Sequence, residues 1–138
     1  MRIRRDLVEE MLGYALAERP RECCGLVAAS GDEAVRVYPV VNTHDHPEYG
    51  YVVDGRELLE RLDEIEGEGW TLGAIYHSHP RTAPVPSQTD INLAFVPDVG
   101  PVWPGSLYII VGFETAEPCV RAYRIDSSTP EEVELSVE

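Results

Sequence analysis

Apolar residues recur at helical spacing in two segments of the chain. The first segment begins near Asp6 and ends before Pro20, and the second begins near Asp54 and ends at Gly67. Asp6 and Asp54 are each followed three positions later by a glutamate, which is the spacing of a capping box. The residues that set the period are Leu7, Met11, Tyr14 and Ala15 in the first segment and Leu58, Leu62 and Ile65 in the second. We therefore expect two amphipathic helices.

Runs of apolar and β-branched residues predict strands between and after these helices. Residues 23–29 and 34–41 flank a Ser-Gly-Asp turn and predict a hairpin. Residues 71–76 are almost all apolar, which suits a strand that is covered on both faces. Further strands are expected near residues 106–112 and 118–125. Helices and strands alternate along the chain, so the pattern indicates an α/β protein.

A short helix and irregular segments account for the rest of the chain. Ser87 opens an apolar-periodic segment that Pro97 closes, and residues 98–105 are rich in proline and glycine, which predicts a loop. The acidic tail after Ser127 is expected to add one short strand or to remain without regular structure. The sequence shows no internal repeat or linker. A chain of this length fits one domain, so we expect residues 1–138 to form a single domain.

The charge balance narrows the classes of partner. The chain carries 11 lysines and arginines against 25 aspartates and glutamates, a net charge of −14. Such a surface repels phosphate backbones, so nucleic acid is not an expected partner, while a protein partner and simple solubility both remain open. No apolar run approaches the ~20 residues of a membrane span, so we expect a cytoplasmic protein without membrane contact. The sequence does not determine the oligomeric state, and a weak homodimer remains among the options.

The cysteines do not form a disulfide framework. Cys23 and Cys24 are adjacent and Cys119 is distant in sequence, a poor arrangement for bridges. Neighbouring residues of a strand point to opposite faces, so Cys23 and Cys24 are expected on different sides of their strand. We expect all three to be buried as small hydrophobic residues in a reducing compartment.

One cluster of residues carries candidate chemistry. His77 and His79 are two positions apart in a segment expected to be extended, so their side chains share a face, and Asp90 can return from the following helix. Three nitrogen or oxygen ligands plus one water form the usual plan of a catalytic zinc site. Zinc in such a site lowers the pKa of its water and polarises a carbonyl oxygen. Glu22 is then a free carboxylate that can transfer a proton.

Each part of the cluster also has an ordinary structural interpretation. Ser87 lies three residues before Asp90, which is a helix-capping pattern, although its hydroxyl can also donate to a developing oxyanion. A lone His-x-His pair is more often unrelated to metal, and we expect the second such pair, His44 and His46, to be solvated. What favours a functional site is the full order of His-x-His followed, at this interval, by Ser-x-x-Asp.

The order of these residues resembles the JAMM (MPN-plus) metalloprotease motif. The motif positions are Glu22, His77, His79, Ser87 and Asp90, and the segment Glu-Cys-Cys-Gly-Leu resembles a strand of the compact prokaryotic members. The resemblance implies a mixed, curved β-sheet packed between helices, an α-β-α sandwich related to the cytidine-deaminase layout. It also implies Zn²⁺ bound by the two histidines and the aspartate, Glu22 as general acid and base, and Ser87 stabilising the tetrahedral intermediate.

The same resemblance implies a substrate class. Family members cleave peptide or isopeptide bonds after the Gly-Gly tail of a ubiquitin-like or sulfur-carrier protein, in some cases releasing cysteine. The segments Asn42–Tyr51 and Pro97–Ser106 resemble variable insertions that could form a substrate groove, or they are plain connections. One alternative is a non-catalytic MPN-type module that binds a protein partner. A nucleic-acid hydrolase is a further alternative, against which the net charge argues.

Overall fold

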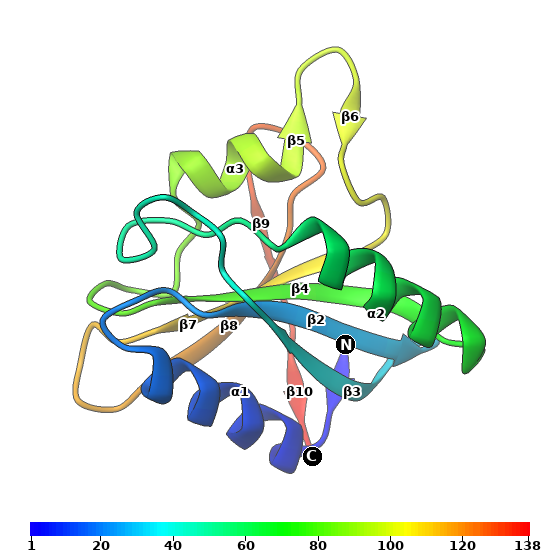
Figure 1. Cartoon of the computed structure of the whole chain (residues 1–138), viewed down its shortest axis with the longest axis horizontal. Helices are drawn as coiled ribbons and strands as arrows, with labels where there is room; N and C mark the ends of the chain where they lie inside the picture. The colour runs from blue at the N-terminus through cyan, green and yellow to red at the C-terminus, as the bar shows by residue number, and fades with distance from the viewer.

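The computed structural model describes all residues from Met1 to Glu138. The chain forms one eight-stranded sheet with helices on both faces, together with a small two-stranded sheet that projects from the body (Figure 1). In chain order the elements are β1 (Arg2–Ile3), α1 (Arg5–Glu18), β2 (Cys24–Ser30), β3 (Glu33–Val40), α2 (Gly55–Gly67), β4 (Thr71–His79), α3 (Gln88–Ala94), β5 (Phe95–Val96), β6 (Gly100–Pro101), β7 (Leu107–Gly112), β8 (Cys119–Arg124), β9 (Glu131–Val133) and β10 (Ser136–Val137).

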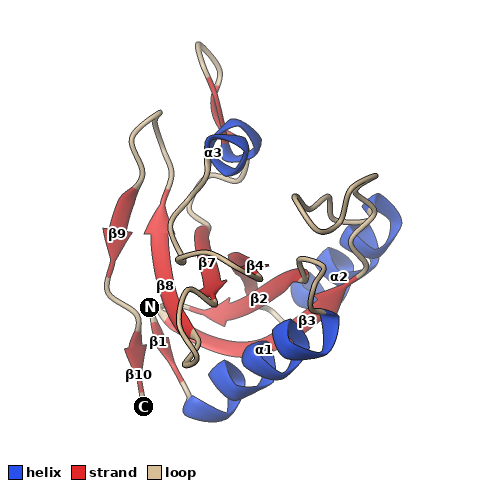
Figure 2. Ribbon diagram, turned by 90° about the vertical axis from the view of Figure 1, so that its left-hand side faces the viewer, coloured by secondary structure: helices blue, strands red, loops and turns tan.

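The large sheet is mixed and curved, as expected. Its strand order is β10-β1-β3-β2-β4-β7-β8-β9. The pairs β2–β3, β2–β4, β7–β8 and β8–β9 are antiparallel, while β4–β7 and both pairings of β1 are parallel. Figure 2 shows the sheet curling so that β9 and β10, the two ends of the strand order, lie on the same side of the view, with β3 on the opposite side. The predicted hairpin of the first two long strands is confirmed as β2 and β3.

Two hydrophobic cores lie on the two faces of this sheet. Alternate side chains of β2 point to opposite faces of the sheet. Val27 lies in the core beneath α1, and Leu26 lies in the core beneath α2 and α3. Both of these side chains are fully buried, as are Ile109 and Ile110, which divide in the same way on β7. A strand buried on both faces must be apolar throughout. Cys23 and Cys24 follow the same rule and enter opposite cores.

The two long helices begin for different reasons. Asp54 caps α2, because its carboxylate accepts from the backbone N–H of Glu57 at 3.0 Å. The expected capping box at Asp6 is wrong: Arg4 is the residue before α1, and it makes no side-chain cap. Asp6 lies inside the first turn, where it pairs with Arg4 at 3.0 Å. A carboxylate at that position still interacts favourably with the helix dipole.

Strand β4 is three residues longer than its apolar run predicts. The sequence places His77 and His79 just after the strand, whereas both lie within it. The ladders on both sides extend the strand, since Cys24 is paired with His77 across β2 and His79 with Gly112 across β7. Hydrogen bonding to two neighbours therefore overrides the change from apolar to polar side chains.

Two other segments differ from expectation. Residues 98–105, predicted as a loop, contain β6, which pairs with β5 to form the projecting hairpin that turns at Asp98. The tail after Ser127 forms two short strands, β9 and β10, and β10 pairs with β1 at the start of the chain. Such short strands have no sequence periodicity of their own, because pairing partners far away in the chain define them.

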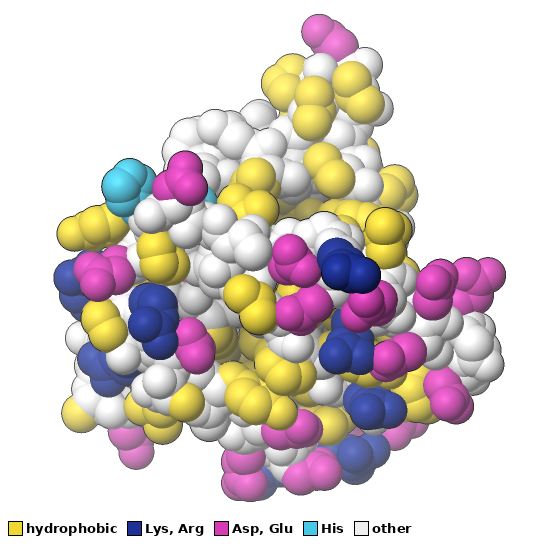
Figure 3. Space-filling model, in the orientation of Figure 1, with side chains coloured by type: hydrophobic (Ala, Val, Ile, Leu, Met, Phe, Trp, Pro, Cys, Tyr) yellow, Lys and Arg dark blue, Asp and Glu magenta, His cyan; other side chains and the backbone are white.

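The surface mixes acidic and basic side chains, and apolar side chains gather on the projecting hairpin (Figure 3). Val96, Val99 and Val102 are exposed there. No helix of the chain is long and apolar enough to span a bilayer. Cys23 and Cys24 are buried as expected, but Cys119 is exposed at the start of β8, so the expectation of burial was wrong for that residue.

Candidate metal and catalytic site

The C-terminal end of β4 holds two imidazoles on one face of the sheet. His77 and His79 alternate with Ser78, so both histidines face the side covered by α2 and α3. His77 is completely buried and His79 is 8% exposed. Asp90 reaches the same place from the first turn of α3, and it is also buried. These three predicted residues therefore come together in the structure.

Three potential ligand atoms converge at this point. His77 Nε2 and His79 Nε2 are 3.1 Å apart. Asp90 Oδ2 lies 3.2 Å from His77 Nε2 and 3.0 Å from His79 Nε2. Zinc bonds of about 2.0–2.2 Å at tetrahedral angles would separate ligand atoms by about 3.3–3.5 Å. The observed triangle is within a few tenths of an ångström of that spacing.

His79 is oriented by a hydrogen bond made through Nδ1, the ring nitrogen that is not part of the triangle. His79 Nδ1 lies 2.9 Å from the carbonyl oxygen of Ala83, so Nδ1 carries the proton and donates it. In the neutral ring this leaves a lone pair on Nε2, directed at Asp90 and His77. A backbone carbonyl in this position is a common outer partner of metal-binding histidines. Ala83 belongs to the connection after β4, in which Pro80, Pro84 and Pro86 make the backbone stiff.

Stacking orients His77. The ring of Tyr51 lies against it with centroids 4.3 Å apart and planes inclined by 20°. The Nδ1 atom of His77 is buried and has no hydrogen-bond partner. With Nδ1 protonated, the Nε2 lone pair meets a second lone pair on His79 and a carboxylate on Asp90. A cation at this point relieves that repulsion, so the donor set fits a metal ion.

The carboxylate of Asp90 is shared between the helix cap and the cluster. Ser87 and Asp90 form the predicted capping box: Asp90 N–H donates to Ser87 Oγ at 3.1 Å, and Ser87 N–H donates to Asp90 Oδ2 at 2.8 Å. Burial alone raises the pKa of Asp90, but in the metal-free protein hydrogen bonds from the protonated imidazoles of His77 and His79 outweigh burial and hold that pKa well below its usual range. Asp90 is therefore ionised, as a metal ligand must be.

Ser87 retains a free donor. Its oxygen accepts from the N–H of Asp90, and its own O–H donates to no protein group. A hydroxyl has one donor and two acceptor sites, so capping the helix does not use the proton. Ser87 is also exposed to the hollow beside the histidines. The structural and catalytic interpretations of this serine are thus compatible.

Glu22 lies two residues before the start of β2, and hydrogen bonds fix its backbone on both sides. Its N–H donates to the carbonyl of Pro47 at 2.7 Å, and its carbonyl accepts from Asn42 Nδ2 at 2.9 Å. The side chain is 7% exposed and lines the same hollow as His79 and Ser87. The structure therefore places a buried carboxylate next to the triangle of potential ligand atoms but outside it.

The environment of Glu22 favours its protonated form. Burial raises the pKa of Glu22 to about 7, with the charge of His79 opposing and that of Asp90 reinforcing the change. A carboxyl group that titrates near neutrality can both accept and return a proton at physiological pH. The pKa shift thus supports a role in proton transfer.

The raised pKa predicts a pH-dependent effect on stability. Folded Glu22 holds its proton more tightly than the unfolded chain, so the metal-free protein loses stability as pH rises from 4.5 to about 7. Glu22→Gln removes that penalty. We expect the variant to be more stable than wild type at pH 8.5 by on the order of 1 kcal/mol, with a smaller advantage at pH 5.5. Urea unfolding of both chelator-treated proteins measures this, and an advantage that shrinks as pH rises contradicts it.

The hollow at the site is small and polar. Its volume is about 210 Å³, and the residues that line it are Glu22, Glu48, Tyr49, His79, Pro80, Arg81, Thr82 and Ser87. A second hollow of about 490 Å³ lies on the other side of Glu22, between α1, the start of β2 and the end of β3. Glu22 lines both. The first hollow contains the candidate chemistry.

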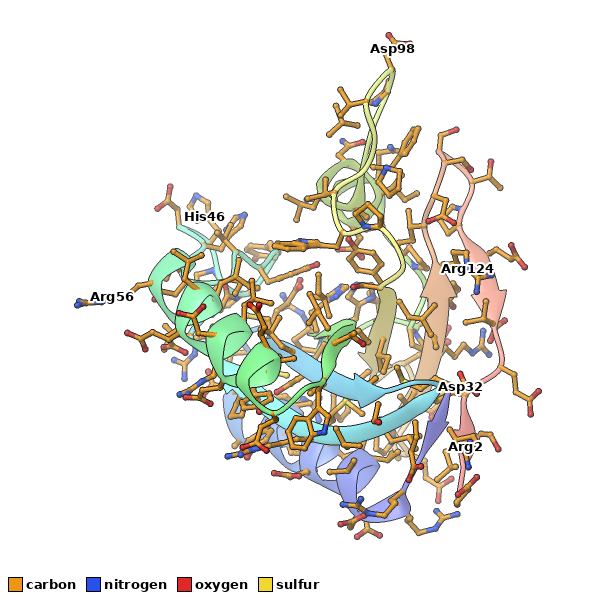
Figure 4. The ribbon with its side chains drawn as sticks, turned by 90° about the vertical axis from the view of Figure 1, so that its right-hand side faces the viewer. Arg2, Asp32, His46, Arg56, Asp98 and Arg124 are labelled. Carbon is orange, nitrogen blue, oxygen red and sulfur yellow. The ribbon has the colours of Figure 1, made fainter.

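The two segments predicted to bind substrate differ in their relation to this hollow. Asn42–Tyr51 contributes Glu48 and Tyr49 to its wall, whereas Pro97–Ser106 contributes no residue and instead forms part of the projecting hairpin. His46 and Asp98 mark the outer parts of these separate projections (Figure 4). The structure therefore brings only the first segment to the candidate site.

Side-chain hydrogen bonds of Asn42 stabilise the Asn42–Tyr51 segment. Its Nδ2 donates to the carbonyls of Glu22 and Gly50, and its Oδ1 accepts from the N–H groups of His44 and Val52. These are all the hydrogen bonds that an amide side chain with two N–H groups and one oxygen readily makes. Asn42 thus connects the loop to the backbone of the candidate base. His44 is half-buried within this loop and is thus less solvated than expected, while His46 is exposed.

Tyr51 and Arg81 are functional candidates that the sequence pattern did not single out. Tyr51 stacks on His77, and Arg81 lines the hollow. Neither residue has a characteristic spacing relative to the motif. Only the arrangement of the loops in space identifies them.

Comparison with known proteins agrees with this geometry. Residues 4–126 match the family described as prokaryotic homologs of the JAB domain. The chain belongs to this family. Its membership confirms the resemblance that the motif indicated.

Several named relatives share much of the sequence. The chain is 35% identical over 136 residues to the CysO-cysteine peptidase of Mycobacterium tuberculosis, covering 94% of this chain and 86% of that protein. It is 43% identical over 90 residues to a probable TtuB-protein conjugate cleaving protease of Thermus thermophilus, covering 65% of this chain and 60% of that protein. The matched region thus spans less than two thirds of the Thermus relative.

Solved structures of other proteins share the fold. A protein from Desulfitobacterium hafniense superimposes with a TM-score of 0.82 at 30% identity, covering 100% of this chain and 93% of that one. A JAB1/MPN domain protein from Archaeoglobus fulgidus gives a TM-score of 0.63 at 23% identity, covering 100% and 96%. These similarities confirm the predicted α/β architecture with a curved mixed sheet between helices.

Proposed function

We propose that this chain is a zinc-dependent metallopeptidase. Its substrate in this proposal is the bond after the C-terminal Gly-Gly of a ubiquitin-like or sulfur-carrier protein, and it releases cysteine or another attached group. The observation that carries the proposal is the triangle of His77, His79 and Asp90, with the buried carboxylate of Glu22 beside it. Metal ligands and an unligated acid together are the parts that hydrolysis of an amide requires.

His77, His79 and Asp90 would hold the zinc, through Nε2, Nε2 and Oδ2. Zinc supplies Lewis-acid activation of water and of the scissile carbonyl. Two histidines and a carboxylate suit zinc better than magnesium or calcium, which take oxygen ligands. The Ala83 carbonyl and the ring of Tyr51 keep the two imidazoles in position.

The remaining residues move protons and stabilise charge. The carboxylate of Glu22 accepts a proton from the attacking water and then returns it to the leaving amine. The free O–H of Ser87 donates to the oxygen that becomes negative as the carbonyl carbon turns tetrahedral. The hydrogen bond from Asp90 N–H fixes the Ser87 oxygen, so the hydroxyl is already oriented before substrate binds.

The relatives support this substrate class by their names. They include a CysO-cysteine peptidase, a probable protease for TtuB-protein conjugates and a desampylase of Haloferax volcanii, the last 36% identical over 98 residues. Each name describes removal of something from a protein conjugate or adduct. We extend that class to this chain because all five motif residues are present at one site, namely Glu22, His77, His79, Ser87 and Asp90.

We also propose that residues 1–138 act as one domain. Strand β10 near the end of the chain pairs with β1 near its beginning, and β1 in turn pairs with β3. One sheet therefore connects the two ends with the strands that carry the site.

Metal analysis and a cleavage assay together test the proposed function. We expect protein purified without chelators to contain about one zinc per chain. We expect it to cleave Gly-Gly-ended sulfur-carrier proteins that bear one added amino acid or a lysine-linked protein, and to lose activity with a zinc chelator. Zinc-free protein under these conditions would refute the mechanism. Zinc with measurable carrier binding but unchanged substrate would favour the non-catalytic binding module.

A further inference from the structure

Arg81 is the only arginine or lysine that lines the 210 Å³ hollow. It follows the second zinc-ligand candidate by two residues and comes from the stiff connection after β4. The hollow also contains Glu22 and Glu48, but Arg81 forms no ion pair with either. No protein oxygen accepts a hydrogen bond from its guanidinium group. All five N–H donors of Arg81 are thus available to a ligand.

Tyr49 holds this guanidinium group at the hollow. The central carbon of the Arg81 guanidinium lies 5.4 Å from the centroid of the Tyr49 ring, within the range of a cation–π contact. Tyr49 comes from the Asn42–Tyr51 loop, so two separate loops meet over the site. Stacking occupies one face of the guanidinium group and leaves its N–H edge free. A planar group fixed in this way can bind a carboxylate through two parallel hydrogen bonds.

The surrounding negative charge disfavours an anionic substrate group that has no cation of its own beside it. The chain has a net charge of −14, and two glutamates line the hollow itself. A carboxylate that entered without a positive partner would be repelled. Arg81 supplies that partner beside the groups that carry out the chemistry.

We propose that Arg81 is a specificity-determining residue that binds a free carboxylate on the leaving-group side of the scissile bond. The α-carboxyl carbon of an amino acid lies two covalent bonds from its nitrogen, so a carboxylate there stays near Glu22 when that nitrogen is the leaving group. The hollow is smaller than the roughly 300–1,000 Å³ of drug-sized ligand sites, which suits one amino acid better than a protein surface.

This inference rests on the proposed function and narrows it. The preferred substrate becomes a carrier protein ending in Gly-Gly followed by a single amino acid with a free C-terminus. An isopeptide-linked protein has no carboxylate at that distance from its lysine nitrogen. Arg81 thus favours release of an amino acid over removal of a conjugated protein.

A binding experiment tests the subsite without requiring turnover. The Glu22→Gln protein, loaded with zinc, is titrated with two synthetic hexapeptides ending in Gly-Gly-Ala, one with a free C-terminus and one amidated, at constant ionic strength. We expect the free acid to bind about tenfold more tightly, the effect of a hydrogen-bonded charged group. In a second protein that also carries Arg81→Ala, the two affinities should agree within about twofold. Arg81→Lys should retain part of the preference. Arg56→Ala, which replaces an exposed arginine outside the hollow, should retain all of it.

The outcomes separate the two proposals. Equal affinities for the two peptides, a preference that survives Arg81→Ala, or no binding of either peptide at millimolar concentration would each overturn the carboxylate subsite. Cleavage assays of single Arg81→Ala should then show a lower kcat/KM for the acid peptide and little change for the amide. A different result would refute the proposed activity and leave the subsite intact. In that result the preference for the acid peptide depends on Arg81, but the protein with Glu22 in place cleaves no substrate.

Discussion

Glu22→Gln is expected to lower kcat by about 10²–10⁴-fold while zinc remains bound, which is the usual contribution of a general acid and base. Glutamine has the size of glutamate but cannot take up a proton. The backbone bonds of Glu22 to Pro47 and Asn42 do not involve the side chain, so the substitution leaves them in place. The measurement is single-turnover cleavage of a Gly-Gly-ended carrier adduct, with zinc content determined on the same sample.

A second carboxylate in the same hollow provides the control. Glu48 lines the hollow but is exposed, and it belongs to the Asn42–Tyr51 loop. We expect Glu48→Gln to retain activity within about threefold, as for a charge screened by solvent. If Glu22→Gln keeps more than a tenth of wild-type activity, or if it loses its zinc, Glu22 is not the base.

The same residue predicts the acid limb of the pH profile. Glu22 must be ionised to accept a proton, so kcat/KM should fall as pH drops below the pKa of Glu22. Burial raises that pKa to about 7, and a bound cation nearby lowers it. The limb should therefore have its midpoint below 7 and should be absent from the residual activity of Glu22→Gln.

Asp90→Asn is expected to weaken zinc binding by more than about 100-fold, because even outer partners of metal ligands contribute 10–100-fold. The substitution removes the negative charge that faces both imidazoles at 3.0 and 3.2 Å. Asparagine keeps the size of the side chain and an oxygen that can accept from Ser87 N–H, so the start of α3 is preserved. Competition with a chromophoric zinc chelator measures the affinity.

Thermal unfolding provides a second readout that does not depend on activity. A ligand that binds only the folded state stabilises it in proportion to the logarithm of its concentration over Kd. Added zinc should therefore raise the Tm of the metal-free wild type and of Asp63→Asn, which alters an exposed carboxylate on α2, but not that of Asp90→Asn. An equal rise in all three proteins would show that Asp90 is not a ligand.

Local patterns were enough to predict much of the fold. The helical period of apolar residues predicted α1 and α2, and the long apolar runs predicted the strands at the centre of the sheet. Ser87 and Asp90 formed the predicted capping box because an N-cap depends only on residues within one turn. The predictions failed where pairing across the chain decides the structure, as at β5, β6 and β10.

The sequence by itself determined which residues could carry the chemistry. The order of Glu22, His77, His79, Ser87 and Asp90 resembles the JAMM motif, and two of its intervals have a local cause: His77 to His79 is one alternation along a strand, and Ser87 to Asp90 is one helical turn. The tertiary structure alone decided that Glu22 lies beside the ligand triangle and that Tyr49, Tyr51 and Arg81 surround it. Those contacts join loops that are distant in sequence. They arise from sheet pairing and core packing, which leave no periodic signal in the residues that they bring together.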